Sequence, residues 1–316
     1  MRILCVGQLV ADIIAAPVEY EKLGTDTEQV NSIEVHNGGD CMNVAINLAK
    51  LGVNVSFCGK VGDDPFGAYL TEVLQLYGVD TRGLTVTDKA ATSSVIVLVN
   101  ASGQRVFLYS GGANNLLCFE DVDDALLHEC SHVHIGGTYL LPAMDGPGSA
   151  MLLKKAQQMG KTTSMDVTWD SSGRWLELIE PCLPFLDVFM PSENEASRIC
   201  GTSLPQSMAA FLKSKGVKIV IIKLGSRGSY IESTQEQFYQ PVFPADVLDT
   251  TGAGDSFTAG FLLKYLQGLS LRNCAEFATA VAAHCIGTIG ATAGVPDCQT
   301  IEQFLKEIHS DRRKTA

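Results

Sequence analysis

Short apolar runs alternate with stretches of helical periodicity along most of the 316-residue chain. The runs are almost continuously apolar, as at residues 219–222, which is typical of strands buried on both faces of a parallel sheet. This alternation predicts an α/β fold with a mostly parallel sheet that helices cover on both faces. The expected strands are residues 2–10, 53–59, 94–99, 105–109, 132–136, 162–166, 188–190 and 218–224. The expected helices are residues 41–51, 66–77, 148–159, 193–200, 204–215, 252–267, 271–286 and 300–309.

Two segments interrupt this alternation. Residues 13–37 are polar and rich in turn formers, with no helical period. Residues 89–111 contain two strand-like runs around the turn at 100–103, the pattern of a β-hairpin. We expect the two segments to form a small β lid on one α/β domain. That domain would comprise residues 1–12, 38–88 and 112–316.

The composition is that of a folded protein with an acidic surface. Hydrophobic residues make up 46% of the chain and charged residues 18%, which is enough apolar material for a sizeable core. The formal net charge is −12. Because an acidic surface repels a phosphate backbone, nucleic acid is not expected as a partner. No apolar run reaches the roughly 18 residues that a membrane helix needs, so no membrane partner is expected either.

Two further features bear on where the protein works. The apolar residues 3–16 loosely resemble a signal peptide, but Asp12 interrupts them, and a buried first strand is the better interpretation. The ten cysteines are scattered, with no CxxC pair and no zinc-site spacing. They predict reduced thiols in a cytoplasmic protein.

The strongest chemical motif is a glycine-rich segment, residues 249–255 (DTTGAGD), that opens an apolar helix. Gly252, Ala253 and Gly254 have little or no side chain, so their amides can approach an anion at the helix start. Asp255 follows in the first turn, where a carboxylate could accept a proton from a substrate hydroxyl beside a phosphoryl group. The alternative is an ordinary turn in which Asp255 only interacts with the helix dipole.

A second motif, Gly38-Gly39-Asp40 followed by Asn43, opens another helix. Asp40 and Asn43 are three residues apart, so they lie on one side of the helix start and could bind sugar hydroxyls. Asp12 follows the first apolar run, at the edge where open parallel sheets bind ligands. The alternatives are that Asp40 only caps the helix and that Asp12 is an ordinary loop acid.

A third segment, residues 223–228 (KLGSRG), places glycines after an apolar strand, where a nucleotide could lie. A simple hairpin is the alternative. Other motifs for nucleotide or hydrolase chemistry are absent: there is no GxxxxGK[ST], no GxGxxG after the first strand and no GxSxG. His132 and His134 alternate with apolar residues, which indicates one face of a strand rather than a metal site.

Together these segments resemble the motifs of the ribokinase-like, or PfkB, family of carbohydrate kinases. Residues 249–255 look like the C-terminal signature of that family, and residues 38–43 look like its GGxxxN substrate motif. Residues 61–67 (VGDDPFG) resemble its VGxDxFG segment, and residues 191–195 (PSENE) resemble its NxxE motif, with Ser192 in the position of Asn. The resemblance extends over nearly the whole chain. It implies the three-layer α/β/α sandwich of the family, with a small β-sheet lid that often pairs to form a homodimer.

The resemblance also implies roles for individual residues in the ATP-dependent phosphorylation of a sugar hydroxyl. Asp255 would be the general base, and the amides of Gly252, Ala253 and Gly254 would form the anion hole. The sugar would be bound by Asp12, Gly38, Gly39, Asp40 and Asn43. The nucleotide would lie along Ser192, Lys223, Gly225 and Gly228. Glu195 would bind Mg²⁺ through water, and Asp249 and Thr251, with residues 290–294, would bind a monovalent cation such as K⁺.

Departures from the family patterns narrow the substrate. Val10 and Asp40 stand where ribokinases usually carry Asn and Lys, which argues against ribose. The GGD sequence resembles 2-keto-3-deoxygluconate kinases and unassigned sugar kinases. However, Ser110 stands where the sugar-acid branch carries an arginine, and Arg105 or Arg174 would have to replace it. We therefore expect a neutral ketose or a related sugar. A sugar-acid kinase, a nucleoside kinase and a sugar-binding protein without catalytic activity are the alternatives.

Overall fold

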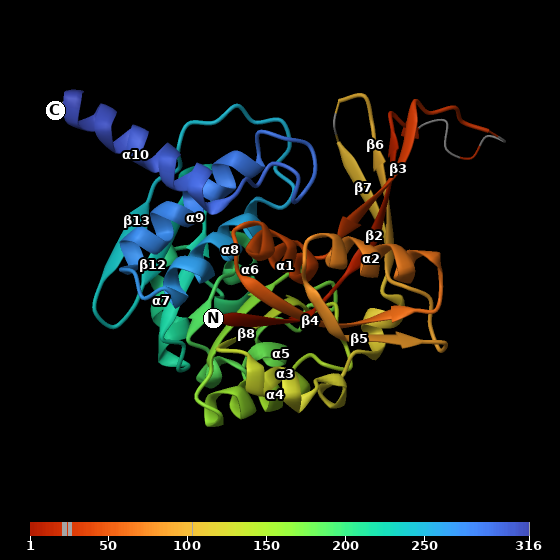
Figure 1. Cartoon of the computed structure of the whole chain (residues 1–316), viewed down its shortest axis with the longest axis horizontal. Coiled ribbons are helices and arrows are strands. Elements are labelled where there is room, and N and C mark those ends of the chain that lie inside the picture. Colours follow the sequence, from red (N-terminus) through yellow and green to blue (C-terminus); the bar gives the residue numbers. More distant parts are fainter. Residues whose placement is uncertain (21–23, 25–26, 103, 316) are drawn as a thin grey trace.

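The computed structural model of the chain describes residues 1–20, 24, 27–102 and 104–315, the last five by their backbone alone. Within these residues the larger of two sheets has nine strands, in the order β13-β12-β11-β10-β9-β8-β1-β4-β5 (Figure 1). All neighbouring strands pair in parallel except at the β11-β12-β13 edge. The bounds are β1 (Arg2–Gly7), β4 (Asn54–Gly62), β5 (Asp80–Thr87), β8 (His132–Thr138), β9 (Thr162–Val167), β10 (Val188–Phe189), β11 (Ile219–Lys223), β12 (Ser229–Glu232) and β13 (Gln237–Gln240).

Helices cover both faces of this sheet and create two apolar cores. One face carries α1 (Asp40–Lys50), α2 (Pro65–Leu76), α8 (Ala253–Leu266), α9 (Leu271–Cys285) and α10 (Cys298–Thr315). The other carries α3 (Asp124–Glu129), α4 (Pro147–Gln158), α5 (Leu176–Ile179), α6 (Glu193–Cys200) and α7 (Pro205–Ser214). Strand β1 shows why both cores form: Ile3 and Cys5 point into the first, and Leu4 and Val6 into the second. The predicted α/β sandwich is confirmed.

The smaller sheet stands beside the main body (Figure 1). Its strand order is β3-β2-β6-β7, with bounds β2 (Val10–Ala16), β3 (Ser32–Gly38), β6 (Ser94–Val99) and β7 (Arg105–Ser110). The predicted hairpin is present, because β6 and β7 pair antiparallel from Ser94 with Ser110 to Val99 with Arg105. Parts of the two predicted lid segments, at 21–23, 25–26 and 103, lie outside the described residues.

The predicted strand 2–10 is wrong at its end. The chain leaves the main sheet at Gly7, where it passes so close to Gly136 that a Cβ would lie 2.0 Å from the Gly136 carbonyl oxygen. Strand β2 then starts at Val10 in the small sheet. Asp12 is therefore a residue of the small sheet, not of a loop after the first strand. An apolar run of this length does not reveal that it serves two sheets, because both halves are buried alike.

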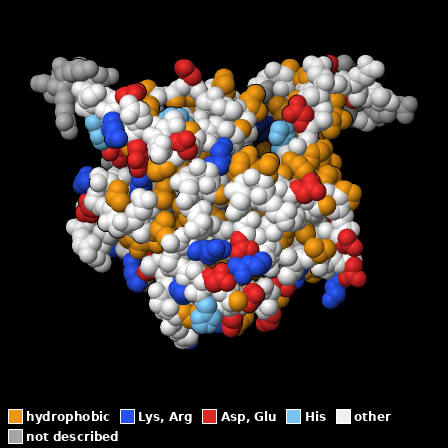
Figure 2. All heavy atoms as spheres, in the orientation of Figure 1, with side chains coloured by type: hydrophobic (Ala, Val, Ile, Leu, Met, Phe, Trp, Pro, Cys, Tyr) orange, Lys and Arg blue, Asp and Glu red, His pale blue; other side chains and the backbone are white. Residues whose placement is uncertain are grey.

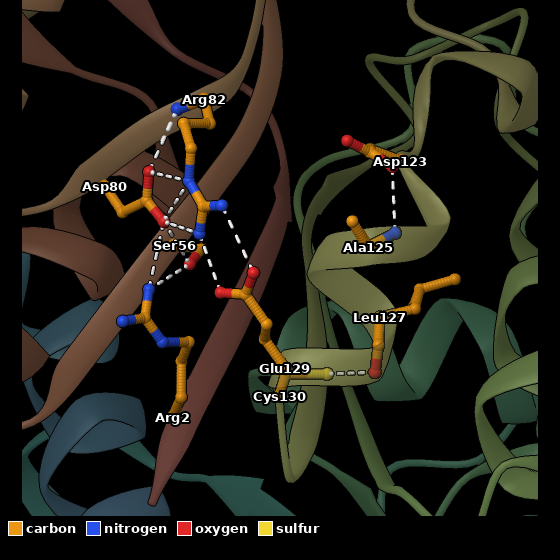
Figure 3. Close-up of polar contacts among 9 residues, drawn as sticks. All are labelled: Arg2, Ser56, Asp80, Arg82, Asp123, Ala125, Leu127, Glu129 and Cys130. Carbon is orange, nitrogen blue, oxygen red and sulfur yellow. Dashed lines mark hydrogen bonds and ion pairs between the residues drawn. The ribbon is translucent and has the colours of Figure 1, made fainter.

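At the amino-terminal ends of the strands, charged residues connect three elements of the main body (Figure 3). The carboxylate of Asp80, at the start of β5, lies 2.9 Å from Arg2 of β1 and 2.7 Å from Arg82. Arg82 also pairs with Glu129 of α3 at 2.7 Å. Arg82 and Glu129 are exposed, and Arg2 and Asp80 are partly exposed. Ion pairs at the surface stabilise a fold only slightly. The chemistry predicted from the sequence lies at the opposite, carboxyl-terminal edge of the sheet.

Candidate active site

The two strongest sequence motifs begin two helices that contact each other. Helix α1 starts at Asp40 and helix α8 starts at Ala253. The Asn43 side-chain amide donates a hydrogen bond of 2.9 Å to Oδ2 of Asp255. One turn further on, the Asn47 amide donates to Oγ of Ser256 at 3.1 Å. Folding thus brings the predicted substrate motif directly against the predicted base.

A glycine precedes each of these two helices, at a position where a side chain would not fit. Gly39 has φ +92°, and a Cβ there would lie 2.8 Å from Cα of Leu9. Gly252 has φ +75°, and a Cβ there would lie 2.3 Å from the carbonyl oxygen of Ala291. Both values lie in the left-handed region that favours glycine. No side chain caps α8 at Gly252, so its first amides have no side-chain partner of the kind that Asp64 provides for α2.

Asp166 is a site residue that the sequence reasoning missed. It lies near the end of β9, and its Oδ2 accepts hydrogen bonds from Lys223 Nζ at 2.6 Å and from Thr258 Oγ1 at 3.1 Å. Lys223 ends β11, and its Nζ lies 3.4 Å from the position of a Cβ on Gly254. The lysine therefore connects the carboxyl ends of two strands to the first turn of α8. The sequence signal that could have identified Asp166 is an acidic residue at the end of an apolar strand.

Ser192 and Glu195 form the start of α6. The Ser192 hydroxyl accepts a hydrogen bond from the Glu195 amide at 3.4 Å, and Oε2 of Glu195 accepts one from the Ser192 amide at 2.7 Å. This reciprocal pair is a capping box. Ser192 also pairs with Lys223 through an isolated β-bridge. Ser192 therefore holds the Glu195 side chain in place at the start of α6.

Four carboxylates surround Lys223 and act on one another. Burial is the main cause that raises the pKa of Asp255 to about 6; Asp166 and Glu195 raise it further, and the hydrogen bond from α1 opposes them. Burial, followed by repulsion from Asp255 and Asp166, raises the pKa of Asp40. Burial lowers the pKa of Lys223, but Asp166 and Glu195 outweigh it and raise that pKa overall. One lysine thus faces more negative charge than it can neutralise.

This surplus of carboxylate oxygens fits Mg²⁺. Among the residues that the structure describes, no three His, Cys, Asp or Glu side chains converge into a metal site on their own. Proteins often bind Mg²⁺ through one or two carboxylates, with water and substrate phosphates completing the octahedron. Glu195 and Asp166, both beside Lys223, offer the carboxylates for that kind of site.

A cavity of ≈ 540 Å³ opens beside the start of α8. Its lining includes Lys223, Gly225 and Gly228, three of the residues that the sequence predicts to lie along a nucleotide. Residues 225–228 also form the turn that connects the antiparallel strands β11 and β12. A Cβ on Gly228 would lie 1.9 Å from the Gln240 carbonyl oxygen. At one end the cavity reaches Ala253 and Gly254. The rest of the lining is mostly apolar: Val242, Phe243, Pro244, Ala245, Val247, Phe257, Ala282, Ala283 and Ile286.

Asp12 lies close to the start of α1. It is paired across the small sheet with His36, and a Cβ on Gly38 would lie 2.3 Å from its carboxylate oxygens. Burial raises the pKa of Asp12 to about 7, and the His36 charge opposes that shift. Asp12 and Gly38 are therefore neighbours, and Gly38 is followed directly by Gly39 and Asp40 of the same predicted motif.

The two arginines considered as carboxylate partners are both engaged elsewhere. Arg174 forms an exposed ion pair with Glu177. Arg105, the first residue of β7, lies 2.9 Å from Oδ1 of Asp249 and also donates a hydrogen bond to Oγ1 of Thr251. Asp249 and Thr251 are the residues predicted to bind a monovalent cation.

Comparison with known proteins shows the family to which the chain belongs. Residues 1–298 match the model of the pfkB family of carbohydrate kinases. The ribokinase of Arabidopsis thaliana is 31% identical over 316 residues, which cover 96% of this chain and 81% of that protein. The ATP-dependent 6-phosphofructokinase of Thermoanaerobacterium thermosaccharolyticum is 27% identical over 307 residues, with 96% and 93% covered. The structure of a proposed ribokinase II from E. coli with ATP and Mg²⁺ aligns with a TM-score of 0.83 and 26% identity, over 97% of this chain and 99% of that one.

The chain belongs to the pfkB family of carbohydrate kinases. It has the ribokinase-like fold and is an ATP-dependent phosphotransferase with an alcohol group as acceptor. In the described part of the chain, no helix has both the length and the apolar character to span a membrane.

Proposed function

We propose that the protein transfers the γ-phosphoryl group of ATP to a hydroxyl of a neutral ketose or a related monosaccharide. The observation that supports this most strongly is the hydrogen bond between Asn43 and Asp255. It joins the helix start that we assign to the sugar with the carboxylate that we assign as base. A hydroxyl bound by Asp40 and Asn43 would lie next to Asp255, within reach for proton transfer.

In the proposed reaction the Asp255 carboxylate accepts the proton of the substrate hydroxyl. The hydroxyl oxygen forms a bond to the γ-phosphorus, and the bond from that phosphorus to the β–γ bridging oxygen breaks, which releases ADP. The amides of Gly252, Ala253 and Gly254 stabilise the charge on the phosphoryl oxygens in the transition state. Because α8 points its positive dipole end at this place, the anion hole needs no charged side chain of its own.

The nucleotide would occupy the cavity beside α8. Its apolar lining suits the faces of a purine base, and Lys223, Gly225 and Gly228 would lie along the nucleotide. Mg²⁺, when bound, would supply charge neutralisation of the phosphates; Glu195 would hold it through water, with Asp166 and Ser192 close by. Lys223 keeps Asp166 in place by the 2.6 Å contact.

A neutral sugar is favoured by the charges around the α1 start. Arg105 and Arg174 are both paired with carboxylates, so neither is free for a sugar acid. Asp12 and Asp40 both have raised pKa values, mainly through burial. Burial already makes ionisation of these two carboxyl groups costly, and an anionic substrate beside them would increase that cost. Hydroxyl groups would instead donate hydrogen bonds to both carboxylates.

The direct test offers purified protein, Mg-ATP and pooled ketoses, aldoses, sugar acids and nucleosides, with phosphorylated products detected by mass spectrometry. A phosphorylated ketose is the expected product. A phosphorylated sugar acid or nucleoside as the main product would overturn the substrate proposal. No product from any pool, from a folded protein that binds ATP, would favour a sugar-binding protein without catalytic activity.

The pH dependence of kcat/KM follows from the environment of Asp255. The base works only when unprotonated, so activity should fall as the pH drops through about 6, the raised pKa of Asp255. The Asn43→Ala variant loses a hydrogen bond that lowers this pKa. Its acid limb, the fall of kcat/KM at low pH, should therefore move to higher pH. Asn47→Ala, which removes the neighbouring contact between α1 and α8, is the control and should keep the wild-type limb. An identical acid limb in all three proteins would contradict the assignment of Asp255.

We also propose that two copies pair through their small sheets. All six residues of β7 are exposed, including Phe107 and Leu108, and Ile33 of β3 is 67% exposed. Hydrophobic side chains gather at this side of the molecule in Figure 2. An exposed apolar patch on a sheet is typical of an interaction surface. The Phe107→Asp/Leu108→Asp variant should sediment as a monomer and wild type as a dimer, with the exposed Leu204→Asp as control. A dimeric double variant would contradict this interface.

We propose that the enzyme works in the cytoplasm. All ten cysteines are unpaired, and seven of them are buried. Free thiols persist in a reducing compartment, which is also where ATP is supplied.

A further inference from the structure

An arginine of the small sheet occupies the place where a monovalent cation was expected. Arg105 starts β7, and one guanidinium nitrogen lies 2.9 Å from Oδ1 of Asp249. The other donates a hydrogen bond to the Thr251 hydroxyl. The pair joins the small sheet to the loop that leads into α8.

Both carboxylate oxygens of Asp249 already accept hydrogen bonds, so few positions remain for a metal ion. Its Oδ1 accepts from the Thr251 amide at 2.9 Å and from the Thr251 hydroxyl at 2.7 Å, besides Arg105. Its Oδ2 accepts from the Gly290 amide at 3.1 Å. Arg105 already supplies one positive charge at this carboxylate. A K⁺ ion at the same oxygens would be repelled by the guanidinium, so these residues do not fit K⁺ while Arg105 is present.

The same loop sets the position of the anion hole. Thr251 directly precedes Gly252, the residue before α8. The Thr251 carbonyl accepts a weak hydrogen bond from Sγ of Cys285 at 3.6 Å, and Gly252 packs closely on Ala291. A change in the position of Thr251 would therefore move the first amides of α8. Arg105 acts on those amides through Thr251, as a positioning residue.

The two partners of this contact differ in exposure. The Asp249 side chain is 6% exposed, whereas the Arg105 side chain is 36% exposed. The arginine lies on a hairpin strand of the small sheet whose six residues are all exposed, so it is the solvent-accessible partner of the pair.

We infer that the guanidinium of Arg105 serves as the built-in monovalent cation of the anion-hole loop. The chain then needs no K⁺, and the small sheet supplies the cation of the loop that leads into α8. The link to the anion hole rests on the proposed function. The replacement of K⁺ by Arg105 does not, because it concerns only which cation Asp249 and Thr251 accept.

The first test measures cation binding without any substrate. Thermal unfolding of wild type and Arg105→Ala is compared in KCl and in choline chloride at equal ionic strength. We expect K⁺ to raise the Tm of the Arg105→Ala variant and to leave the wild-type Tm unchanged. An equal K⁺ effect on both proteins, or none on the variant, would overturn the inference. This readout holds even if no substrate is found.

The second test uses turnover with the sugar that the product screen identifies. In choline chloride the Arg105→Ala variant should lose activity by about 10- to 100-fold, as expected for losing a hydrogen bond between charged groups. KCl or a low concentration of guanidinium chloride should restore much of it, while wild type should not respond to K⁺. Activation of wild type by K⁺, or a loss that neither cation repairs, would contradict the inference.

The controls separate this role from a general loss of charge or fold. Arg82→Ala removes another arginine that pairs with two carboxylates, at the far edge of the sheet (Figure 3). It should show no new response to K⁺. Arg105→Gln keeps a polar side chain without the charge, and should respond to K⁺ as Arg105→Ala does. If Arg105→Ala does not fold, Arg105→Gln decides the question.

Discussion

Replacing Asp255 with asparagine is expected to abolish phosphoryl transfer while the fold and ATP binding are retained. Asparagine keeps the shape of the side chain but cannot accept the proton of a substrate hydroxyl. Loss of a positioned general base lowers rates by about 10²- to 10⁴-fold. Asn43 donates its amide to Oδ2 of Asp255, and the amide oxygen of an asparagine can accept that bond. The variant should therefore still hold α1 against α8.

The stability of this variant adds a second, independent readout. The folded-state pKa of Asp255 is about 6, above its ordinary value of 3.8. A raised carboxyl pKa means that folding favours the protonated form, so stability is lost as the pH rises from 3.8 through about 6. Above that range the charged carboxylate destabilises the fold, and a neutral asparagine removes the cost. The Tm of Asp255→Asn at neutral pH should be equal to or above that of wild type.

Turnover, Tm and ATP binding by calorimetry are to be measured on the same preparation. Asn47→Ala is a suitable comparison, because it alters the same helix contact without touching the base. Near-wild-type turnover by Asp255→Asn would remove the proposed mechanism. A large drop in Tm with loss of ATP binding would instead make Asp255 a structural residue.

The sequence predicts the fold and the two helix starts because both depend on local patterns. Buried parallel strands read as apolar runs, and a helix start that approaches a ligand needs residues such as Gly39 and Gly252 at a positive φ. The hydrogen bond between Asn43 and Asp255 spans 212 positions, yet the two motifs that it joins were each visible alone. The likeness of these motifs to one family then placed them in one site.

What the sequence did not reveal depends on contacts between distant elements. Asp12 lies in the small sheet because the chain changes sheets after Gly7, and nothing in the apolar run marks that change. Asp166 gains its place from Lys223, which comes from a different strand. Arg105 meets Asp249 across 144 positions, so an arginine on an exposed hairpin strand could not be matched to its carboxylate. None of these residues stands out in its local sequence. The place of each in the structure depends on a contact with a distant part of the chain.

The ion pair between Lys223 and Asp166 should be the most strongly coupled pair in the molecule. The side chains are only 16% and 4% exposed, and Nζ lies 2.6 Å from Oδ2. Removal of one member of a buried pair leaves an uncompensated charge and commonly costs about 3–5 kcal/mol of unfolding free energy. Lys223→Met should therefore destabilise the fold by about that amount. Without the lysine, the pKa of Asp255 should also rise, because Lys223 lowers it.

The double variant Asp166→Asn/Lys223→Met distinguishes a coupled pair from two separate contributions. With both charges gone, no buried charge lacks a partner, and Thr258 can still donate to the asparagine oxygen. We expect the double variant to regain much of the stability that Lys223→Met loses. The measurement is urea unfolding of wild type, the two single variants and the double variant. The exposed pair Arg174 and Glu177 is the control and should show little coupling. If the two losses simply add, Lys223 does not serve to neutralise Asp166, and its position beside Gly254 points to the nucleotide phosphates alone.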